Sequence, residues 1–503
     1  MRDYLKNNDW QYPIVSRTGT TPEDMVMHVQ EAVSLRDMLL SFEDPAATLK
    51  LLASSAVRIV SLTITEFGYR VPLNEGDFKL VELALNGDLD GDLHAEDLDP
   101  ACRKATVFGL ILASLAMRFK SGVRPYTVMS CDNLPHNGEV AKRRLVGAIA
   151  DLPADITHGD RCESFAKWLE EEVKYPSTMV DRITPATSPR DVKDLEEKTG
   201  TRDEWPVMCE PYKHWVIEDN FVDGSRPNWE DVGALLVPDV RPHELMKVRL
   251  LNVTHSAMCY AGILAGLEHV HETVSHKMIR PYLKRLMTTE IAASLRADPS
   301  MAQLIDGLAS YAELVLNRFE NVAVKDTVER IAMDGSEKFR VQGRAVVTEG
   351  LADERSVRGF ALYVATWAHY LKNTVAAGRK VRDASADLIS APWVGGGGGL
   401  AAFLDIEEVF GVLAQHEGWR SAVGREFEDI AETGLEAALL GYIFGTGHNS
   451  NGDLSNMDGG DSRRTSERVS GTFCLDETCA PIAEEAQTTI AEQQQVAFVH
   501  LEA

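Results

Sequence analysis

Two β-branched runs separated by a long apolar helical segment set the strongest limit on how this chain can fold. The runs V-R-I-V-S-L-T-I-T (57–65) and P-Y-T-V-M-S-C (125–131) are each typical of a buried strand. Residues 101–120 between them carry an apolar helical pattern, and an amphipathic helical pattern follows at 138–152. Strands separated by helices predict parallel pairing in one sheet. We therefore expect an α/β domain over residues 1–200.

Polar residues follow both predicted strands directly. Thr65 and Glu66 end the first run, and Asp132 and Asn133 come just after the second. Ligands of open α/β sheets bind beyond the carboxyl ends of the parallel strands. The pattern therefore predicts that these four residues lie near a ligand, with Thr65, Glu66 and Asn133 as the candidates for contact with a cofactor. For Asn133 an alternative stays open, because an asparagine here can also cap a helix that begins at or before Gly138.

The remainder of the chain has a different character. A length of 503 residues is too great for one hydrophobic core, so a second domain is expected. Long helical patterns dominate from about residue 201, which predicts a mostly α-helical domain over 201–445. They cover 244–270, 275–295, 301–319, 355–373 and 406–444. Residues 446–503 hold ten acidic and three basic residues and few large apolar ones, which predicts a disordered acidic tail.

Charge and cysteine usage exclude several classes of protein. The formal net charge of −26 argues against nucleic acid or an anionic membrane as the main partner. The longest apolar run, 107–117, is too short to cross a bilayer, and no secretory signal opens the chain. Seven mostly isolated cysteines indicate free thiols in a reducing compartment. We expect a cytoplasmic protein that acts on a small molecule, as a monomer or weak oligomer.

Three local patterns resemble ligand sites without meeting their requirements. The acidic loop 86–97 places Asn86 and Asp97 where a calcium-binding loop needs Asp and Glu, so we expect a solvated surface loop. The run of five glycines at 395–399 follows no strand and predicts a flexible loop. Cys474 and Cys479 lack further ligands nearby. We therefore expect no metal site.

The segment E-L-M-K-V-R-L-L-N-V-T-H (244–255) carries the pattern most suggestive of chemistry. On a helix that turns ~100° per residue, Glu244, Asn252 and His255 fall within about 140° of Lys247. The rest of the segment is largely apolar, which predicts a buried helix. A buried amine beside an amide and an imidazole can move a proton on and off an alcohol. A structural polar cluster that braces the helix against a sheet would show the same spacing.

Seven strings in order along the chain resemble one enzyme family. They are S-L-T-I-T-E-F-G-Y (61–69), S-C-D-N-L-P-H-N-G (130–138), S-T-M-V-D-R-I-T-P-A-T (177–187), C-E-P-Y-K-H-W-V-I-E-D (209–219), K-V-R-L-L-N-V-T-H (247–255), D-G-S-E-K (334–338) and F-L-D-I-E-E-V-F-G (403–411). The chain resembles the polyol-specific long-chain dehydrogenases, a group that includes the mannitol 2-dehydrogenases. The resemblance covers about residues 1–445. It implies a Rossmann-type dinucleotide-binding domain followed by a helical substrate domain.

The resemblance also implies a role for individual residues. Lys247 matches the general base, Asn252 and Asn133 match the pair that holds the reacting oxygen, and His255 matches a residue that orients substrate. Glu244 matches a carboxylate that relays the proton of the base to solvent. The resemblance places Asp181, Arg330 and Lys338 in the polyol pocket. Taken singly, Asp181 could form a surface pair with Arg182, and Arg330 and Lys338 could be solvated surface residues.

The implied reaction is metal-independent hydride transfer between NAD, or NADP, and a polyol, with D-mannitol and D-fructose as the expected pair. A fructuronate-type hexuronate reductase is the alternative within the family, and an extra cation in the pocket would distinguish it. The chain has no G-x-G-x-x-G turn, and its first residues resemble a segment well inside the family's first domain. We therefore expect a Rossmann domain that is incomplete at its start. A truncated, non-catalytic relative that keeps the sugar pocket is the alternative from another class.

Overall fold

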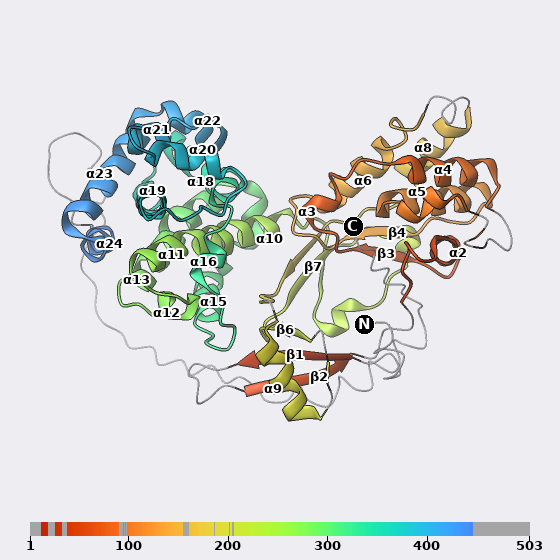
Figure 1. Cartoon of the computed structure of the whole chain (residues 1–503), viewed down its shortest axis with the longest axis horizontal. Coiled ribbons are helices and arrows are strands. Elements are labelled where there is room, and N and C mark those ends of the chain that lie inside the picture. The colour runs from red at the N-terminus through yellow and green to blue at the C-terminus, as the bar shows by residue number, and fades with distance from the viewer. Residues whose placement is uncertain are drawn as a thin grey trace.

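A computed structural model describes most of the chain between residues 12 and 445. It describes the backbone alone for residues 12–18, 26–32 and 160, and describes residues 38–89, 94, 96, 98–153, 161–185, 187–200, 202–203 and 206–445 in full. These residues form an α/β part and a helical part that lie side by side (Figure 1). The expected acidic tail, with Cys474 and Cys479, and much of the acidic loop at 86–97 lie outside the described residues.

The α/β part contains three small sheets. β3 (Ile59–Leu62) and β4 (Thr127–Ser130) pair in parallel, which confirms the two expected strands and their direction. β7 (His214–Glu218) pairs antiparallel with β5 (Thr178–Asp181) and parallel with β8 (Leu235–Val237). β1 (Tyr12–Thr18) pairs antiparallel with β2 (Val26–Ala32) and parallel with β6 (Val207–Cys209).

Helices cover the β3–β4 pair on the side shown uppermost in Figure 1. They include α4 (Glu75–Asn86), α5 (Val107–Lys120), α6 (Asn137–Gly147) and α8 (Asp160–Glu171); α2 (Pro45–Ala53), α3 (Thr65–Gly68) and α9 (Pro189–Thr199) complete this part. The expected helices at 101–120 and 138–152 correspond to α5 and α6, with a short 3₁₀ turn, Pro100–Lys104, before α5. Because α5 is apolar almost throughout, it can be buried on nearly all sides.

Arg118 is the exception in the apolar α5, and it is buried. Its guanidinium donates hydrogen bonds to the backbone carbonyl of Leu52 in the last turn of α2 and to those of Ser54 and Val57, which lie between α2 and β3. A fourth bond reaches the carbonyl of Arg124 at 2.9 Å. Burial lowers the pKa of Arg118 below its usual value. One side chain therefore binds backbone carbonyls at the end of α2, before β3 and before β4.

The helical part begins after β8, later than the sequence patterns predicted. Its helices are α10 (Arg241–Met246), α11 (Val253–Leu264), α12 (Val270–Val274), α13 (Ile279–Leu286), α14 (Ala292–Arg296), α15 (Leu308–Phe319), α16 (Val328–Ile331), α17 (Gly335–Lys338), α18 (Arg344–Ala352), α19 (Arg358–Ala376), α20 (Ala386–Ser390), α21 (Gly399–Leu404), α22 (Glu407–Phe410), α23 (Glu417–Thr433) and α24 (Leu435–Phe444). The sequence patterns changed near residue 200, ahead of β6, β7 and β8, because these strands span only three to five residues each. Strands this short leave little period-2 pattern to detect.

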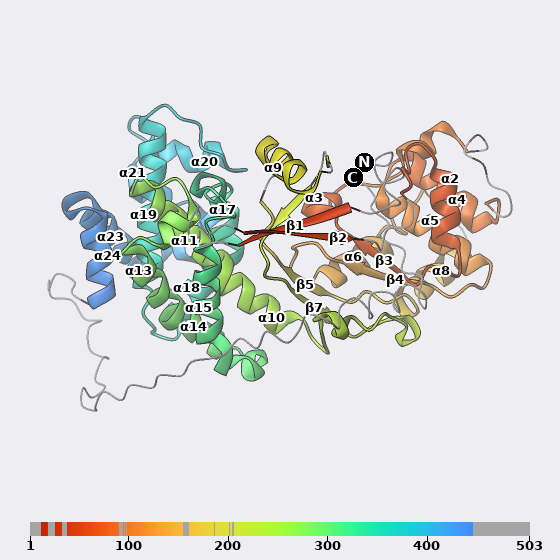
Figure 2. The ribbon, with the colours of Figure 1, turned by 90° about the horizontal axis from the view of Figure 1, so that it is seen from below.

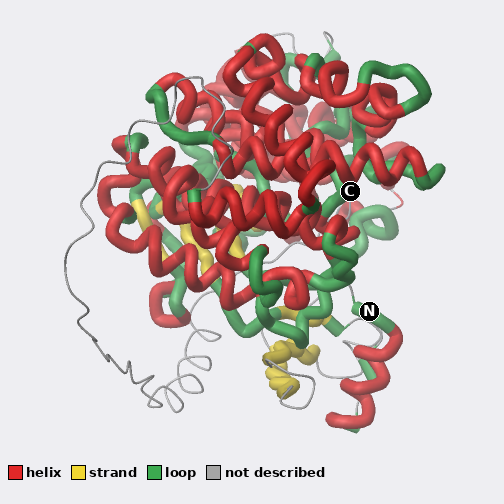
Figure 3. The backbone as a smooth tube through the Cα atoms, turned by 90° about the vertical axis from the view of Figure 1, so that its left-hand side faces the viewer, coloured by secondary structure: helices red, strands yellow, loops and turns green. Residues whose placement is uncertain are grey.

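Buried aromatic side chains form much of the core of the helical part, in which helices pack on helices throughout (Figure 3). Trp367 packs edge-on against Phe403, and Phe339 packs near both Trp367 and Trp419. The five-glycine loop precedes α21, and Gly396, Gly398 and Gly399 adopt positive φ angles there. Among the described helices, none is both long enough and apolar enough to cross a membrane. The five described cysteines are free thiols, as expected.

Candidate active site

Lys247 lies where the helical part meets the α/β part. Lys247 directly follows α10, which lies beside β7 in both views (Figure 1 and Figure 2). Its ammonium nitrogen donates hydrogen bonds to Oδ1 of Asn133 at 3.0 Å and to the carbonyl oxygen of Val180 at 2.5 Å. The side chain of Lys247 is 8% exposed. The expected juxtaposition of Lys247 and Asn133, which lie in different parts of the fold, is present.

The burial of Lys247 changes its affinity for protons. Burial lowers its pKa below the usual value for lysine; the carboxylates of Asp181 and Glu244 oppose this, and the charge of Arg318 adds to it. Desolvation penalises the charged form of an amine, so a larger fraction of the amine is neutral at a given pH. A neutral amine can accept a proton from a bound hydroxyl group.

The helix around Lys247 is not the regular α-helix that the sequence predicted. Residues Lys247–Asn252 form a π-helical turn between α10 and α11, in which the N–H of Val253 donates to the carbonyl of Val248. Such turns close hydrogen bonds between residues five apart and are frequent at functional sites. Lys247 and Asn252 are five apart, so they lie about one turn apart on the same side. The separation of about 140° expected from an α-helix was therefore wrong.

Arg249 anchors this π turn from its buried side. Its guanidinium forms two 2.7 Å hydrogen bonds with the carboxylate of Glu349 on α18 and a third with Ser294 on α14. Bidentate arginine–carboxylate pairs fix geometry as well as adding energy. The turn that carries Lys247 is therefore held by two neighbouring helices.

Both asparagine amides are free to bind a ligand. Within the described residues, no group bonds to the side-chain amide of Asn252, and the Nδ2 of Asn133 donates to none. Asn133 does not cap α6, because that helix begins after His136 and has no side-chain cap. The capping alternative for Asn133 is therefore wrong. With Oδ1 of Asn133 bound to Lys247, its N–H groups can donate to an oxygen next to the amine.

Glu244 lies one turn before Lys247 and is half-buried. Its carboxylate accepts a long hydrogen bond, 3.4 Å, from the backbone N–H of His136. Burial raises the pKa of Glu244, while His136 and Lys247 act in the opposite direction. A carboxylate with a raised pKa can take up and release a proton closer to neutrality.

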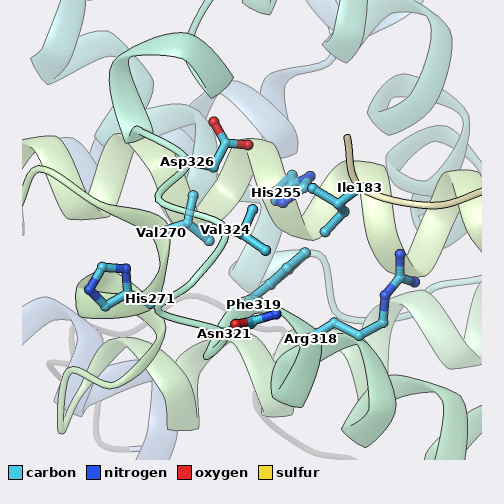
Figure 4. Close-up of a pocket in the computed structure, with 9 residues that line it drawn as sticks. All are labelled: Ile183, His255, Val270, His271, Arg318, Phe319, Asn321, Val324 and Asp326. Carbon is cyan, nitrogen blue, oxygen red and sulfur yellow. The ribbon is translucent and has the colours of Figure 1, made fainter. Parts of the chain in front are cut away.

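His255 lines a small pocket in the helical part (Figure 4). The lining residues are Ile183, His255, Val270, His271, Arg318, Phe319, Asn321, Val324 and Asp326. The imidazole of His255 stacks on the ring of Phe319, with 4.1 Å between the ring centroids. Burial lowers the pKa of His255 to about 3, against the opposing charge of Asp326. The imidazole is therefore neutral near pH 7, so one ring nitrogen can donate and the other can accept a hydrogen bond.

Arg330 and Lys338 lie near His255, and each is already bound to another group of the protein. Arg330 on α16 is exposed and forms an ion pair with Asp326, whose carboxylate lines the pocket. Nζ of Lys338 donates to the carbonyl of Ile331 at 2.7 Å, and burial lowers the pKa of Lys338. The half-buried Lys338 is therefore not the solvated surface lysine of the alternative interpretation.

The D-G-S-E-K string that precedes Lys338 has a packing explanation. Gly335 lies so close to α11 that a Cβ atom there would come within 2.0 Å of the hydroxyl of Tyr260. The backbone N–H and the hydroxyl of Ser336 both bond to the carboxylate of Asp383. These contacts hold α17 against α11, and so they position Lys338.

Asp181 lies in a buried ion cluster. Arg318 on α15 binds the carboxylate of Asp181 with two hydrogen bonds of 2.7 and 2.8 Å, and binds Glu210 as well. Arg182 donates to the backbone carbonyl of Glu210, so the alternative of a surface Asp181–Arg182 pair is wrong. Sequence reasoning missed Arg318 and Glu210, because a single charged residue in a helix or loop is usually solvated.

Thr65 and Glu66 lie beyond the end of β3, as expected, beside the end of β4. The backbone N–H of Thr65, which has a φ of +60°, donates to the carboxylate of Asp132 at 2.7 Å. Tyr69 donates to the other oxygen of Asp132. The side chain of Glu66 is exposed. This turn is therefore held open at the strand ends, where open α/β sheets bind nucleotides.

The strand ends fit part of a dinucleotide. Glu66 and Asn133 are exposed and offer hydrogen-bonding groups at the strand ends, and Asn133 also contacts Lys247, which suits the sugar and the reactive ring of such a cofactor. Neither of the two loops that directly follow β3 and β4 is glycine-rich, so neither supplies the usual pyrophosphate turn. Among the residues described by the structure, no group of three His, Cys, Asp or Glu side chains could hold a metal ion.

Comparison with known proteins agrees with this geometry. Residues 3–231 match the model of the mannitol dehydrogenase Rossmann domain, and residues 239–431 match that of the mannitol dehydrogenase C-terminal domain. The chain is 36% identical over 443 residues to mannitol dehydrogenase 2 of Saccharomyces cerevisiae, covering 87% of this chain and 83% of that one. It is 34% identical over 434 residues to the polyol:NADP oxidoreductase of Gluconobacter oxydans, covering 85% and 83%.

Two solved structures share the fold. One is the Pseudomonas fluorescens mannitol 2-dehydrogenase in a ternary complex with NAD and D-mannitol, at 32% identity and a TM-score of 0.66. The alignment covers 89% of this chain and 85% of that one. The other is a substrate-free D-sorbitol dehydrogenase, at 32% identity and a TM-score of 0.68, with 87% and 85% covered.

Proposed function

Because the chain belongs to the mannitol dehydrogenase family, we propose that it is an NAD(P)-dependent oxidoreductase that interconverts D-mannitol and D-fructose. The observation that carries this proposal is the buried Lys247 amine, 3.0 Å from Oδ1 of Asn133 and about one π turn from Asn252. When bound, NAD(P) supplies the acceptor or donor of the hydride. Lys247, Glu244, Asn133 and Asn252 provide the acid–base and oxygen-binding chemistry.

The amine of Lys247 and the two asparagine amides have different roles in the reaction. As a polyol is oxidised, Lys247 accepts the proton of the reacting hydroxyl group. The N–H groups of Asn133 and Asn252 donate to the same oxygen as its negative charge grows, and losing such a donor typically costs ~100-fold or more in rate. Glu244 then takes the proton from Lys247 toward solvent, and neutral His255 orients a hydroxyl group of the substrate.

The charges of the pocket favour a neutral polyol over a hexuronate. Among the residues that line the pocket in Figure 4, Arg318 is the one with a permanent positive charge, and two carboxylates bind it. His255 is neutral near pH 7, and the carboxylate of Asp326 is paired with Arg330. A substrate carboxylate would thus find no unpaired permanent cation among these lining residues.

The first test is binding of the cofactor, followed by a substrate panel. We expect NADH or NADPH to quench the tryptophan fluorescence of the purified 503-residue chain with a saturable curve. Fructose should then be reduced faster than fructuronate at equal concentrations. Saturable cofactor binding with a clear preference for fructuronate would refute the choice of a neutral substrate. A folded chain that binds neither dinucleotide would instead be a non-catalytic relative.

The lowered pKa of Lys247 predicts how the rate of oxidation depends on pH. Only the neutral amine accepts a proton, so kcat/KM for mannitol oxidation should rise with pH. Its midpoint should lie below the ordinary lysine value of 10.5. The check is a pH series of initial rates at saturating dinucleotide. A midpoint at or above the ordinary value would show that the amine titrating in the reaction is not buried.

Weakening the anchor of the π turn should reduce the rate without removing any group that contacts substrate. We expect Arg249→Met to lower kcat/KM by roughly 10- to 100-fold, because misplacing a reacting group by about 1 Å has an effect of this size. Arg296→Met on α14 is the matched control, since Arg296 is exposed and lies outside the site. Equal rates for the two variants would show that the anchor does not position Lys247.

A further inference from the structure

Arg318 connects the two parts of the molecule through a buried ion cluster. It belongs to α15 of the helical part, whereas its partners Asp181 and Glu210 lie at the end of β5 and just after β6. The three residues are 6%, 4% and 2% exposed. The guanidinium binds Asp181 at 2.7 and 2.8 Å and Glu210 at 2.7 and 3.1 Å, and it lies 4.0 Å from the centre of the Tyr212 ring.

The same strand end also contacts Lys247. Val180, which precedes Asp181 in β5, accepts the 2.5 Å hydrogen bond from the Lys247 amine through its carbonyl. The orientation of that carbonyl therefore depends on how the end of β5 is held. Arg318 holds it by the carboxylate of Asp181, with a weaker contribution from the hydroxyl of Tyr311 at 3.3 Å.

The cluster also sets the charge that surrounds the amine. The charged or titratable groups that act on Lys247 are Asp181 and His214 on facing strands, Arg318 on α15 and Glu244 on its own helix. Asp181 raises the pKa of Lys247, and Arg318 lowers it. Without Arg318, the negative charge of Asp181 would act on the amine unopposed, and an opposite charge nearby favours the protonated form.

We propose that Arg318 is a positioning residue for Lys247, which holds the end of β5 against the amine and shields the amine from the carboxylate of Asp181. This inference rests on the proposed function, in which neutral Lys247 is the base. Arg318 itself contacts neither the reacting oxygen nor the cofactor in this scheme. Its effect on the reaction passes through Asp181, Val180 and Lys247.

Two substitutions in the cluster should move the pH profile in opposite directions. In Arg318→Met the midpoint of kcat/KM for mannitol oxidation should rise by about one pH unit, because Asp181 is left unbalanced. The rate below the midpoint then falls about tenfold. In Asp181→Asn the midpoint should fall, because the attraction is removed while Arg318 keeps Glu210 as a partner. The double variant should return toward the wild-type midpoint.

A purely structural role would not produce this pattern, because loss of structure lowers the rate of both variants without opposite shifts. Arg420→Met is the matched control, since Arg420 lies on α23, on the side of the helical part away from α10, and forms an ion pair with Asp405 (Figure 1). Its midpoint should equal that of the wild type. If Arg318→Met fails to fold, the pH profile of Asp181→Asn tests the proposal by itself. A midpoint of kcat/KM that is unchanged or raised in Asp181→Asn would overturn the proposal.

A second readout does not require activity. Trace acetylation of the full chain with acetic anhydride over a pH series, followed by mass spectrometry of the peptide that contains Lys247, measures the fraction of neutral amine directly. The two variants should shift this curve as they shift the rate profile. Opposite shifts in an inactive chain would support the role of Arg318 while refuting the proposed reaction. Parallel shifts, or none, would overturn the role of Arg318 itself.

Discussion

Replacing Lys247 with alanine is expected to lower the rate of mannitol oxidation by roughly a thousandfold, within the range that a general base contributes. The amine lies 3.0 Å from Oδ1 of Asn133, beside the amide that would hold the reacting oxygen. No other amine is placed to replace it among the described residues, because Lys338 is bound to the carbonyl of Ile331. Single-turnover measurement of NADH formation isolates this step from product release.

The same substitution should leave the fold largely intact. Burial lowers the pKa of Lys247, which means that the buried charge opposes folding and its removal does not leave a partner ion behind. Thermal unfolding of the variant should therefore stay near that of the wild type. Lys277→Ala, at an exposed lysine paired with Glu436, is the matched control for both measurements. If Lys247→Ala keeps more than a tenth of the wild-type rate, Lys247 is not the base.

Replacing Arg118 with methionine should produce the largest loss of stability in the α/β part. The substitution removes every donor that the guanidinium offers to the carbonyls of Leu52, Ser54 and Val57. The carbonyl of Ser54 still accepts from the backbone N–H of Val57, whereas those of Leu52 and Val57 lose the donor that Arg118 supplies. Each buried acceptor left without a partner costs about 1–3 kcal/mol, so we expect a loss of about 4 kcal/mol. The apolar chain of methionine fills most of the space, so the effect reports mainly on the hydrogen bonds.

The stability of the Arg118→Met variant should be measured within the α/β part, because a chain of two parts does not unfold in one step. Hydrogen–deuterium exchange in peptides from α2 and α5 should accelerate, while exchange in α11 and α19 should not. The matched control is Arg103→Met, since Arg103 donates one surface hydrogen bond to the carbonyl of Glu43. It should change stability by less than about 0.5 kcal/mol. Equal exchange in the two variants would contradict the role assigned to Arg118.

Local patterns in the sequence were enough to predict the elements that carry the site. The β-branched runs predicted β3 and β4 and their parallel pairing, because residue type and periodicity report directly on a buried strand. The spacing of Lys247, Asn252 and His255 predicted one polar side on a buried helix. The strand-end pattern singled out Asn133, and the family resemblance assigned it to the same site as Lys247, to which the structure brings it from 114 positions away in the chain.

The tertiary structure alone decided the features that tune the site. The π turn at Lys247–Asn252 depends on Arg249 and its partners on α14 and α18, so the sequence around Lys247 does not reveal it. The side chains of Asp181, Arg318 and Arg118 carry no local signal, since a lone charged residue usually lies in solvent. Each became buried because partners 60 to 140 positions away satisfy its hydrogen bonds. Periodicity records which side of an element is apolar, whereas the partner that a side chain meets across the fold depends on how whole elements pack. For this reason the sequence determined the helices and strands, and only the folded chain determined the charge around Lys247.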